Sequence, residues 1–356
     1  MTSASPMPLS FSREIFATVS PAPYLLANLT NVEGEEYPRR TNSRQTDEFR
    51  LPIINVNSLQ HCFGSAVVRT GDTAVVCGVR GEILHSSDIA NPPNVPATSL
   101  HPQSGTAGSD TASPAQDIYE IPALNLLVPN IELATGSSPA YLPGNPPTAL
   151  AQTLSQRMLS LLHSTRLVDV NDLRILYQPP ATPEDEETPD VSPAVEIKAY
   201  WTLYIDILFM SLDGNPFDAA WGALLAALKN TKLPRAWWDP DLEMIVCSDA
   251  ISDARGLNLH GVPVSVSFAV FDTKRHKGMG EKDMAWVLAD PDTFEEGLCE
   301  ETVTIVVDGL SSNGMQLRRI EKSGGTIVGK DIMRSIVGRA AKRWEEWHSV
   351  IGQAGG

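Results

Sequence analysis

Residues 200–234 read YWTLYIDILFMSLDGNPFDAAWGALLAALKNTKLP, a strand, turn and helix in succession. Apolar residues are nearly continuous over 198–210, which predicts a strand covered on both faces. The DGNP residues 213–216 supply turn chemistry, with Asn215 as the helix cap and Pro216 at the first helical position. The apolar side chains that follow predict one buried helical stripe: Phe217, Ala220, Trp221, Leu224, Leu225 and Leu228.

Strand and helix signals alternate around this stretch. Two β-rich runs within 64–84 flank the turn residues 70–72, which predicts a hairpin. Residues 148–162 carry a helical apolar stripe directly after two prolines, and a second stripe runs over 332–351 beside several basic residues. We interpret that basic side as a solvated helix face. The pattern indicates an α/β (α+β) protein.

Length and charge limit the possible organisation. A chain of 356 residues exceeds the usual single domain, so it contains two domains or one domain enlarged by insertions. Its formal net charge of -16 repels a phosphate backbone, so any contact with nucleic acid must come from a local patch or from partner subunits.

The four cysteines lie far apart and form no CxxC pair. Cys77 and Cys299 sit in or beside strand-like segments, so we expect reduced, buried thiols of an intracellular protein. We see no apolar run of membrane-helix length and no signal peptide, which favours a soluble protein.

Three stretches interrupt the folded pattern. Residues 86–116 are rich in Pro, Ser, Thr, Ala, Gly and Asn, and residues 179–193 place acidic residues among prolines. Both compositions predict disordered loops inserted at the surface. Residues 274–282 have mixed charges and two glycines, which is typical of an extended hairpin tip.

DGNPFDAA and the following ALLAALKNTKLP resemble the RNase PH fold, in the version used by non-catalytic ring subunits of the RNA exosome. Further segments agree in the same order: GSAVVRTGDTAVVCGVRGE (64–82), VPNIEL (128–133), VPVSVSFAVF (262–271) and WVLADPDTFEEGLCEETVTIVVD (286–308). Together they cover most of residues 44–343. The resemblance implies two related layers of β-sheet and helix.

The resemblance also implies a domain organisation. Residues 1–43 form an N-terminal extension, 44–235 the first RNase PH-like domain with insertions at 86–116 and 180–193, and 258–343 the second domain. Residues 344–356 are the end of the C-terminal helix and a tail.

Active relatives cleave RNA with inorganic phosphate, which needs an anion-binding loop, arginines and a carboxylate. In this chain the corresponding region, GSSPAYLPGNPPTALAQTLSQR (136–157), has no arginine before Arg157. It also contains four prolines, which lack the backbone N–H that binds an anion. We therefore expect the phosphate site to be absent.

The aspartates of the 200–234 stretch support the same prediction. By resemblance, active subunits have an acidic residue, then Gly, and then a helix start that bears an arginine. This chain has Asp213 and Gly214, but Asp218 adds negative charge where a cationic side chain would be wanted. Asp206 lies between two isoleucines in the strand, where pairing with a basic group is favoured over a catalytic role. We assign no catalytic residue, no cofactor and no metal, because the histidines are scattered and no GxSxG or HExxH motif occurs.

A basic cluster precedes the first strand in PRRTNSRQTDEFR. It resembles an arginine-bearing stretch of relatives, although Thr41 and Asn42 replace the usual Pro and Asp. Two alternatives stay open: contact with RNA phosphates at the channel of a ring or with a neighbouring subunit, or salt bridges to acidic loops. The candidate RNA-binding residues are Arg39, Arg40, Arg44 and Arg50. Arg69 and Arg80 belong to the first hairpin, and strand alternation does not decide which faces a channel.

By resemblance, the chain is a non-catalytic wall of a six-membered ring that passes RNA to other nucleases. The implied partners are other RNase PH-like subunits, cap subunits with RNA-binding domains, a hydrolytic exonuclease and RNA. The implied processes are rRNA maturation and mRNA turnover in nucleus, nucleolus and cytoplasm. One alternative is an active phosphate-dependent exoribonuclease, and another is a free-standing, monomeric protein-binding module.

Overall fold

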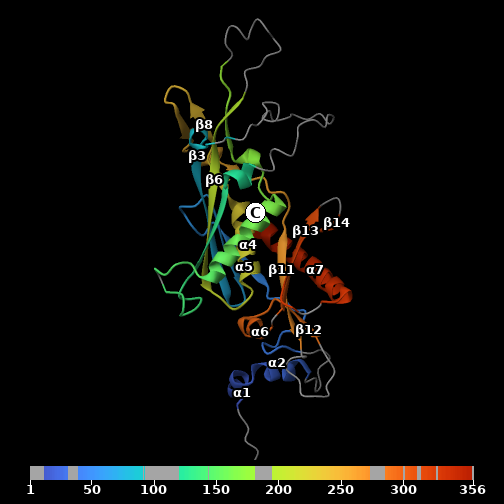
Figure 1. Cartoon of the computed structure of the whole chain (residues 1–356). Coiled ribbons are helices and arrows are strands. Elements are labelled where there is room, and N and C mark those ends of the chain that lie inside the picture. Colours follow the sequence, from blue (N-terminus) through green and yellow to red (C-terminus); the bar gives the residue numbers. More distant parts are fainter. Residues whose placement is uncertain are drawn as a thin grey trace, which may run out of the picture.

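Two β-sheets with helices between them form the body of the molecule (Figure 1). The computed structural model describes residues 12–30, 39–90, 92, 120–142, 144–180, 195–272, 285–299, 301–310, 314–325 and 328–354. The predicted α/β class is confirmed, and one hydrophobic core joins both sheets to the helices between them.

The first sheet has six strands in the order β1-β2-β3-β6-β4, with β5 paired to the first half of β6. Its strands are β1 (Pro52–Val56), β2 (Gly64–Thr70), β3 (Thr73–His85), β4 (Leu127–Leu133), β5 (Arg174–Tyr177) and β6 (Glu196–Ser211). The β2–β3 hairpin turns at the predicted residues. β4 runs parallel to β6, and the other pairings are antiparallel.

Strand β6 is covered on both faces only along its first half. Residues 199–203 are all buried, but beyond them buried side chains such as Ile205 alternate with more exposed ones. Leu208 and Met210 are 36% and 53% exposed. The prediction of cover on both faces was therefore wrong for the second half. Helix α5 covers one face there, and no described element covers the other.

Helix α5 (Pro216–Asn230) is the centre of the molecule, packed against both sheets. Every residue from Phe217 to Leu228 is buried, so the predicted single stripe understates the contact. A helix lying between two sheets has no solvent-facing side. Pro216 begins the helix as predicted, but Asn215 has a left-handed backbone (φ 49°) and makes no side-chain capping bond.

Helix α4 (Ala149–Thr165) lies beside α5 and begins after Thr148, whose Oγ1 accepts the Ala151 N–H. The described helix agrees with the expectation at 148–162. Its buried side packs on β4.

The second sheet has four antiparallel strands in the order β12-β11-β13-β14. They are β11 (Val264–Asp272), β12 (Ala285–Ala289), β13 (Glu301–Leu310) and β14 (Gly314–Ser323), with α6 (Thr293–Leu298) between β12 and β13. The predicted hairpin tip at 274–282 lies outside the described residues.

Helix α7 (Lys330–Ala354) packs on α5, β1, β11 and β13, and so ties the C-terminus to both sheets. Trp347 fills the space above Gly222 of α5, where an added Cβ would lie 2.3 Å from the indole ring. The predicted division between residues 343 and 344 falls inside this continuous helix.

Two helices precede the first sheet, α1 (Arg13–Val19) and α2 (Pro21–Thr30). Leu25 and Leu29 of α2 are fully buried in a small core with Phe271 and Leu288 of the second sheet. The N-terminal extension therefore docks on the C-terminal half of the chain, at the bottom of Figure 1.

Four short strands form two separate two-stranded sheets: β7 (Lys232–Leu233) pairs with β10 (Arg255–Gly256), and β8 (Ala236–Asp239) pairs with β9 (Met244–Cys247). The insertion predicted at 86–116 begins as an ordered 3-10 turn, Ser86–Asp88, in which Ser86 Oγ donates to the Ile197 carbonyl. Residues 93–116 and nearly all of 179–193 lie outside the described part of the chain. Cys77 and Cys299 are buried free thiols, as expected.

Candidate functional site

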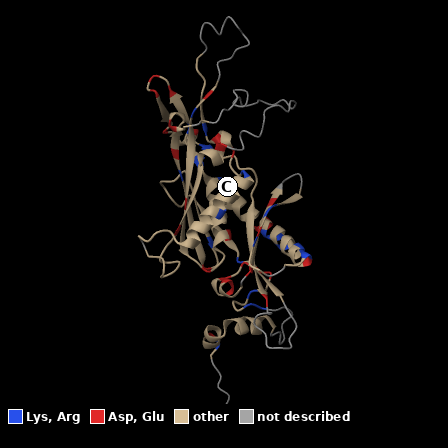
Figure 2. Cartoon of the chain, viewed as in Figure 1, with Lys and Arg blue, Asp and Glu red and all other residues tan. Residues whose placement is uncertain are grey.

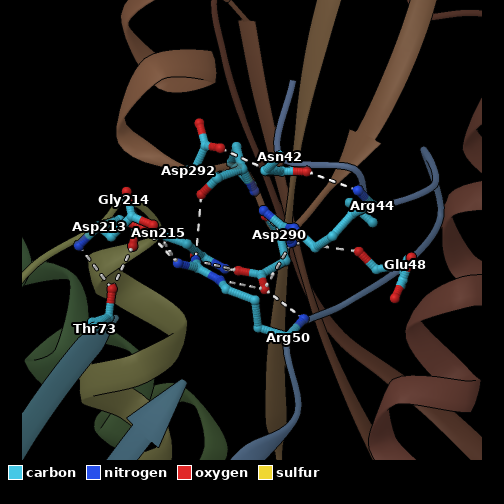
Figure 3. Close-up of polar contacts among 12 residues, drawn as sticks. Asn42, Arg44, Glu48, Arg50, Thr73, Asp213, Gly214, Asn215, Asp290 and Asp292 are labelled. Atoms are coloured by element: carbon cyan, nitrogen blue, oxygen red, sulfur yellow. Dashed lines mark hydrogen bonds and ion pairs between the residues drawn. The ribbon is translucent and has the colours of Figure 1, made fainter. Parts of the chain in front are cut away.

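The N-terminal arginines converge on Asp290, the residue that follows β12 (Figure 3). The backbone N–H and Nε of Arg50 each lie 2.9 Å from Asp290 Oδ2, and Nη2 lies 2.7 Å from Oδ1. Arg50 Nη1 also donates to the Asp213 carbonyl at 2.6 Å. Burial alone would raise the pKa of Asp290, but the Arg50 hydrogen bonds and charge hold it well below its usual range. Arg50 thus joins the end of β6 to the second sheet.

Arg40 is buried in the same region and is paired to Glu295 of α6. Both side chains are fully inaccessible to solvent, and the two groups form a bidentate ion pair with Nε 2.6 Å from Oε1. Nη1 donates to the Ala289 carbonyl at 2.6 Å. This pairing leaves the Arg40 guanidinium no free face for an RNA phosphate.

Arg44 donates to the Asp290 carbonyl at 3.0 Å, and burial together with the nearby Arg40 charge lowers its pKa. Its side chain is 14% exposed, whereas Arg39 is the exposed member of the cluster. Of the two alternatives for these arginines, the geometry of Arg40, Arg44 and Arg50 favours salt bridges. Their partners are Asp290 and Glu295 rather than the acidic loops.

Asp218 is a structural residue of the same interface. Its carboxylate accepts Ser265 Oγ at 2.5 Å, Ser267 N–H at 2.7 Å and Asn215 Nδ2 at 2.9 Å. Burial raises its pKa, partly offset by these hydrogen bonds. Asn215 Nδ2 also donates to Asp290 at 2.8 Å, so the turn before α5 is fastened to the second sheet.

Asp206 points to the open face of the first sheet, away from α5, because its neighbours Ile205 and Ile207 are buried. Arg80 Nε donates to its Oδ2 at 2.9 Å, and Asn130 Nδ2 lies 3.4 Å from Oδ1. The carboxylate is thus paired with a basic group, the arrangement favoured by the sequence. Arg80 therefore also faces this open side, where Arg69 pairs with Asp72 at 3.8 Å.

A groove of about 410 Å³ lies between β4 and the first turns of α4, next to the 136–157 segment in which the sequence predicts no phosphate site. Its lining includes Pro129, Asn130, Pro147, Gln152 and Ser155. Among the described residues that line it, none is charged. Inorganic phosphate binding needs cationic or backbone donors, and prolines remove the latter.

Arg157, the only arginine of the 136–157 segment, points away from this groove. Its guanidinium carbon lies 3.9 Å from the centroid of the Phe217 ring, and Nη2 lies 2.7 Å from Glu321 of β14. It also donates to Thr304 Oγ1 at 3.3 Å. Arg157 therefore joins α4 to the second sheet.

Sequence reasoning missed the acidic half of this interface. Asp292 and Glu295 form a reciprocal capping box at the start of α6, a D-x-x-E pattern visible in ADPDTFEE. That pattern locates the helix start, but nothing in it indicates that Glu295 pairs with Arg40. Within the described ranges, no cluster of metal-ligating side chains occurs and no helix is long and apolar enough to cross a membrane.

Comparison with protein families matches residues 48–234 to the 3′ exoribonuclease family, domain 1, known as RNase PH. The sequence segments favour the rrp43 type of exosome subunit over its rrp42 and rrp45 paralogues. In agreement, the exosome complex component rrp43 of Schizosaccharomyces pombe is 31% identical over 92% of this chain and 94% of its own length. The exosome complex component Rrp42 of Archaeoglobus fulgidus is 25% identical over 88% of this chain and 89% of its own.

Solved structures agree on the fold. A chain of the Archaeoglobus fulgidus exosome with RNA bound to the active site superposes with a TM-score of 0.56 at 23% identity, covering 93% of this chain and 98% of that chain. A chain of an archaeal exosome core gives a TM-score of 0.54 at 21% identity, covering 94% and 97%. These likenesses confirm the predicted RNase PH architecture.

Proposed function

Because the chain belongs to the RNase PH family of 3′ exoribonucleases, we propose that it is a ring subunit of an RNA exosome core. The exosome subunits that resemble it along nearly their whole length support this role. In the ring it helps to form the channel through which RNA passes for processing and degradation from the 3′ end. The division into domains at 44–235 and 258–343 forms part of the proposal.

Two separate apolar surfaces support ring membership. On the open face of the first sheet, Ile53, Leu208 and Met210 are 59%, 36% and 53% exposed. On edge strand β14, Leu317 and Ile320 are each 46% exposed. Exposed apolar faces and strand edges favour association, and a subunit within a ring needs two such contacts.

We further propose that the subunit is catalytically inactive. The observation that carries this is the uncharged groove at the start of α4, together with the use of Arg157, Asp206 and Asp218 in contacts within the chain. A transition state at phosphorus requires positive groups around the transferred oxygens. In this chain Arg157 is instead paired with Glu321, so its positive charge does not face the groove.

Arg39 is the member of the basic cluster that we propose for RNA contact, because its side chain is exposed. Arg40, Arg44 and Arg50 then act by fixing the second sheet against the first. For the whole complex we propose work on ribosomal and messenger RNA in nucleolus, nucleus and cytoplasm.

Assembly is tested by native mass measurement of complexes purified through this chain. We expect a complex with other RNase PH-like subunits and with cap subunits. A monomer as the only species would overturn the ring assignment and would favour the free-standing binding module.

Inactivity is tested by incubating the purified chain with single-stranded RNA, phosphate and a divalent metal. We expect no nucleoside diphosphate release, and we expect Asp206→Ala and Asp213→Ala to leave the activity of the reconstituted complex unchanged. Phosphate-dependent release that either substitution abolishes would establish the alternative, an active exoribonuclease.

A further inference from the structure

A second pocket lies at the upper end of the first sheet, away from the groove beside α4. It has a volume of about 370 Å³, within the range of small-ligand sites. The polar and aromatic side chains around it include Arg235 and Trp237 of the β7–β8 region, Arg255 of β10, Trp201 of β6, and Asn171 and Asp172. Trp201 precedes Asp206 by five positions along β6, a separation of about 17 Å in a strand.

The pocket carries surplus positive charge in a chain whose net charge is -16. Arg235 and Arg255 are exposed and make no ion pair with any described residue. Of the other two charged groups of the lining, Arg174 is paired with a carboxylate, and Asp172 keeps a single negative charge against the two exposed arginines. Arg174 donates to Glu120, with Nη2 2.6 Å from Oε1, and Asp172 accepts both the N–H and the Nδ2 of Asn258.

Asp253 is one acidic group on which the Arg235 charge acts. The Arg235 charge contributes to lowering the Asp253 pKa, but hydrogen bonds from Ser248 and Ser252 contribute more. Asp253 lies in the short η4 turn, Ile251–Asp253, and is not part of the pocket lining. Within the described part of the chain, no carboxylate is therefore paired with either arginine of the pocket.

The aromatic surface of the pocket is also accessible. Trp237 is 39% exposed, although burying a tryptophan is favourable, while Trp201 is only 6% exposed and packs edge-on against Phe63. Trp201 is therefore held by its packing, whereas the Trp237 indole is accessible to a ligand. The ribbons of the central helices α4 and α5 are almost free of charged residues (Figure 2).

We propose that this pocket binds single-stranded RNA, with a base stacked on Trp237 and a phosphate held by Arg235 and Arg255. Stacking on an exposed aromatic ring beside cationic side chains is the general means of holding unpaired nucleotides. The proposal deepens the proposed function and rests on it, because it gives this subunit an RNA contact of its own outside the groove beside α4. An acidic peptide would satisfy the arginines but would make less use of the open indole face.

The experiment cross-links the complex, purified through this chain, to a 4-thiouridine-substituted oligouridylate and identifies the adducts by peptide mass measurement. We expect an adduct on the peptide that contains Trp237. Arg235→Gln combined with Arg255→Gln should lower its yield about tenfold, since each phosphate contact contributes to the salt-dependent affinity. Arg13→Gln, at an exposed arginine of α1, is the matched control and should leave the yield unchanged.

Stacking is tested at the same position by two substitutions of different size. Trp237→Ala should reduce the adduct about tenfold, whereas Trp237→Phe, which keeps an aromatic face, should retain most of it. Equal loss in both variants would contradict the stacking role.

Native mass measurement on the same samples separates the two proposals. An intact ring without an adduct at Trp237, or with one that the double arginine variant does not change, would overturn the pocket and leave the ring assignment standing. Polyglutamate and unmodified oligouridylate are each added as competitors before cross-linking. If polyglutamate lowers the adduct yield at the same concentration as the oligouridylate, the pocket is a site for acidic polypeptides instead. Failure of the chain to enter any ring would overturn the proposed function. The adduct at Trp237 would still be measured on the purified chain, so the pocket is tested independently of ring entry.

Discussion

At the residue scale, Asp290 is a buried charge held by several hydrogen bonds. It is 2% exposed and accepts three hydrogen bonds from Arg50, and another from Asn215. A buried ion pair is weak evidence of net stabilisation, but removal of one partner leaves the other charge buried and unpaired. Without Asp290, the buried Arg50 guanidinium would keep only its longer ion pair with Asp213, at 3.5 Å.

We therefore expect Asp290→Asn to lower the free energy of unfolding by about 3–5 kcal/mol. The matched control is Asp72→Asn, which removes the Arg69–Asp72 pair, whose side chains are 62% and 85% exposed. Such an exposed pair contributes little, so the control should be nearly neutral. Thermal unfolding of the purified complex measures both, and equal midpoints for the two variants would contradict the role of Asp290.

Glu296 makes the stability of this region depend on pH. Burial raises its pKa from 4.5 to about 7, although it accepts the Asn215 N–H at 2.8 Å. Between those pH values the folded state holds a proton that the unfolded state has lost, so stability falls as pH rises through this window.

Glu296→Gln keeps an acceptor for the Asn215 N–H but does not titrate. Relative to this variant, the unsubstituted protein should lose about 2 kcal/mol of stability between pH 5 and pH 8. The difference between their thermal midpoints, measured across this range, is the test. A constant difference would show that the Glu296 carboxyl is ionised throughout.

At the element scale, the contact between α5 and α7 holds the C-terminal helix on the core. Gly222 leaves room for the Trp347 indole, with which a Cβ would collide at 2.3 Å. Trp347 is 2% exposed and has nowhere to move without disturbing the core. Gly222→Ala should therefore cost about 1–3 kcal/mol through overpacking.

A second helical glycine supplies the control. An added Cβ at Gly338 of α7 meets nothing within 4 Å, so Gly338→Ala should stabilise the helix by about 0.5–1 kcal/mol. Opposite shifts of the unfolding midpoint for the two Gly→Ala changes are expected. A stabilising Gly222→Ala would show that Trp347 can leave its position.

The elements also show how far local sequence reaches. The β2–β3 hairpin, β6, α4 and α5 follow from turn residues and apolar periodicity, because these signals are local. The open face of β6 and the complete burial of α5 do not, since both depend on which layers lie above them. Helix α2 was not predicted, because the core that covers Leu25 comes from β11 and β12, far along the chain.

The same distinction applies to the site. The lack of an arginine before Arg157 in the 136–157 segment is read from residue types alone, and none of the described residues that line the groove is charged. The arginine cluster was recognised from its residue types. Whether these arginines contact RNA or form salt bridges could not be predicted, because their partners Asp290 and Glu295 lie about 240 to 255 positions away. Contacts at such separation leave no trace in one sequence.

At the scale of the whole molecule, the two apolar surfaces decide whether the chain is stable alone. Leu208 lies opposite Val76 on the open face of the first sheet, in a row that no described element covers. Leu317 lies on β14, which pairs only with β13 among the described strands. We expect the isolated chain to self-associate or be poorly soluble, and co-expression with an RNase PH-like paralogue to give a soluble heterodimer.

Substitution of one residue on the open face tests this directly. Leu208→Asp should not unfold the subunit, because the side chain is already 36% exposed, but it should place a charge inside a subunit contact and remove the chain from the complex. Leu242→Asp, at a hairpin-turn leucine that is 61% exposed, is the control and should co-purify normally. Co-purification of Leu208→Asp at the unsubstituted level, or a lone chain that sediments as a well-behaved monomer and forms no heterodimer with any paralogue, would exclude the open face as a ring contact.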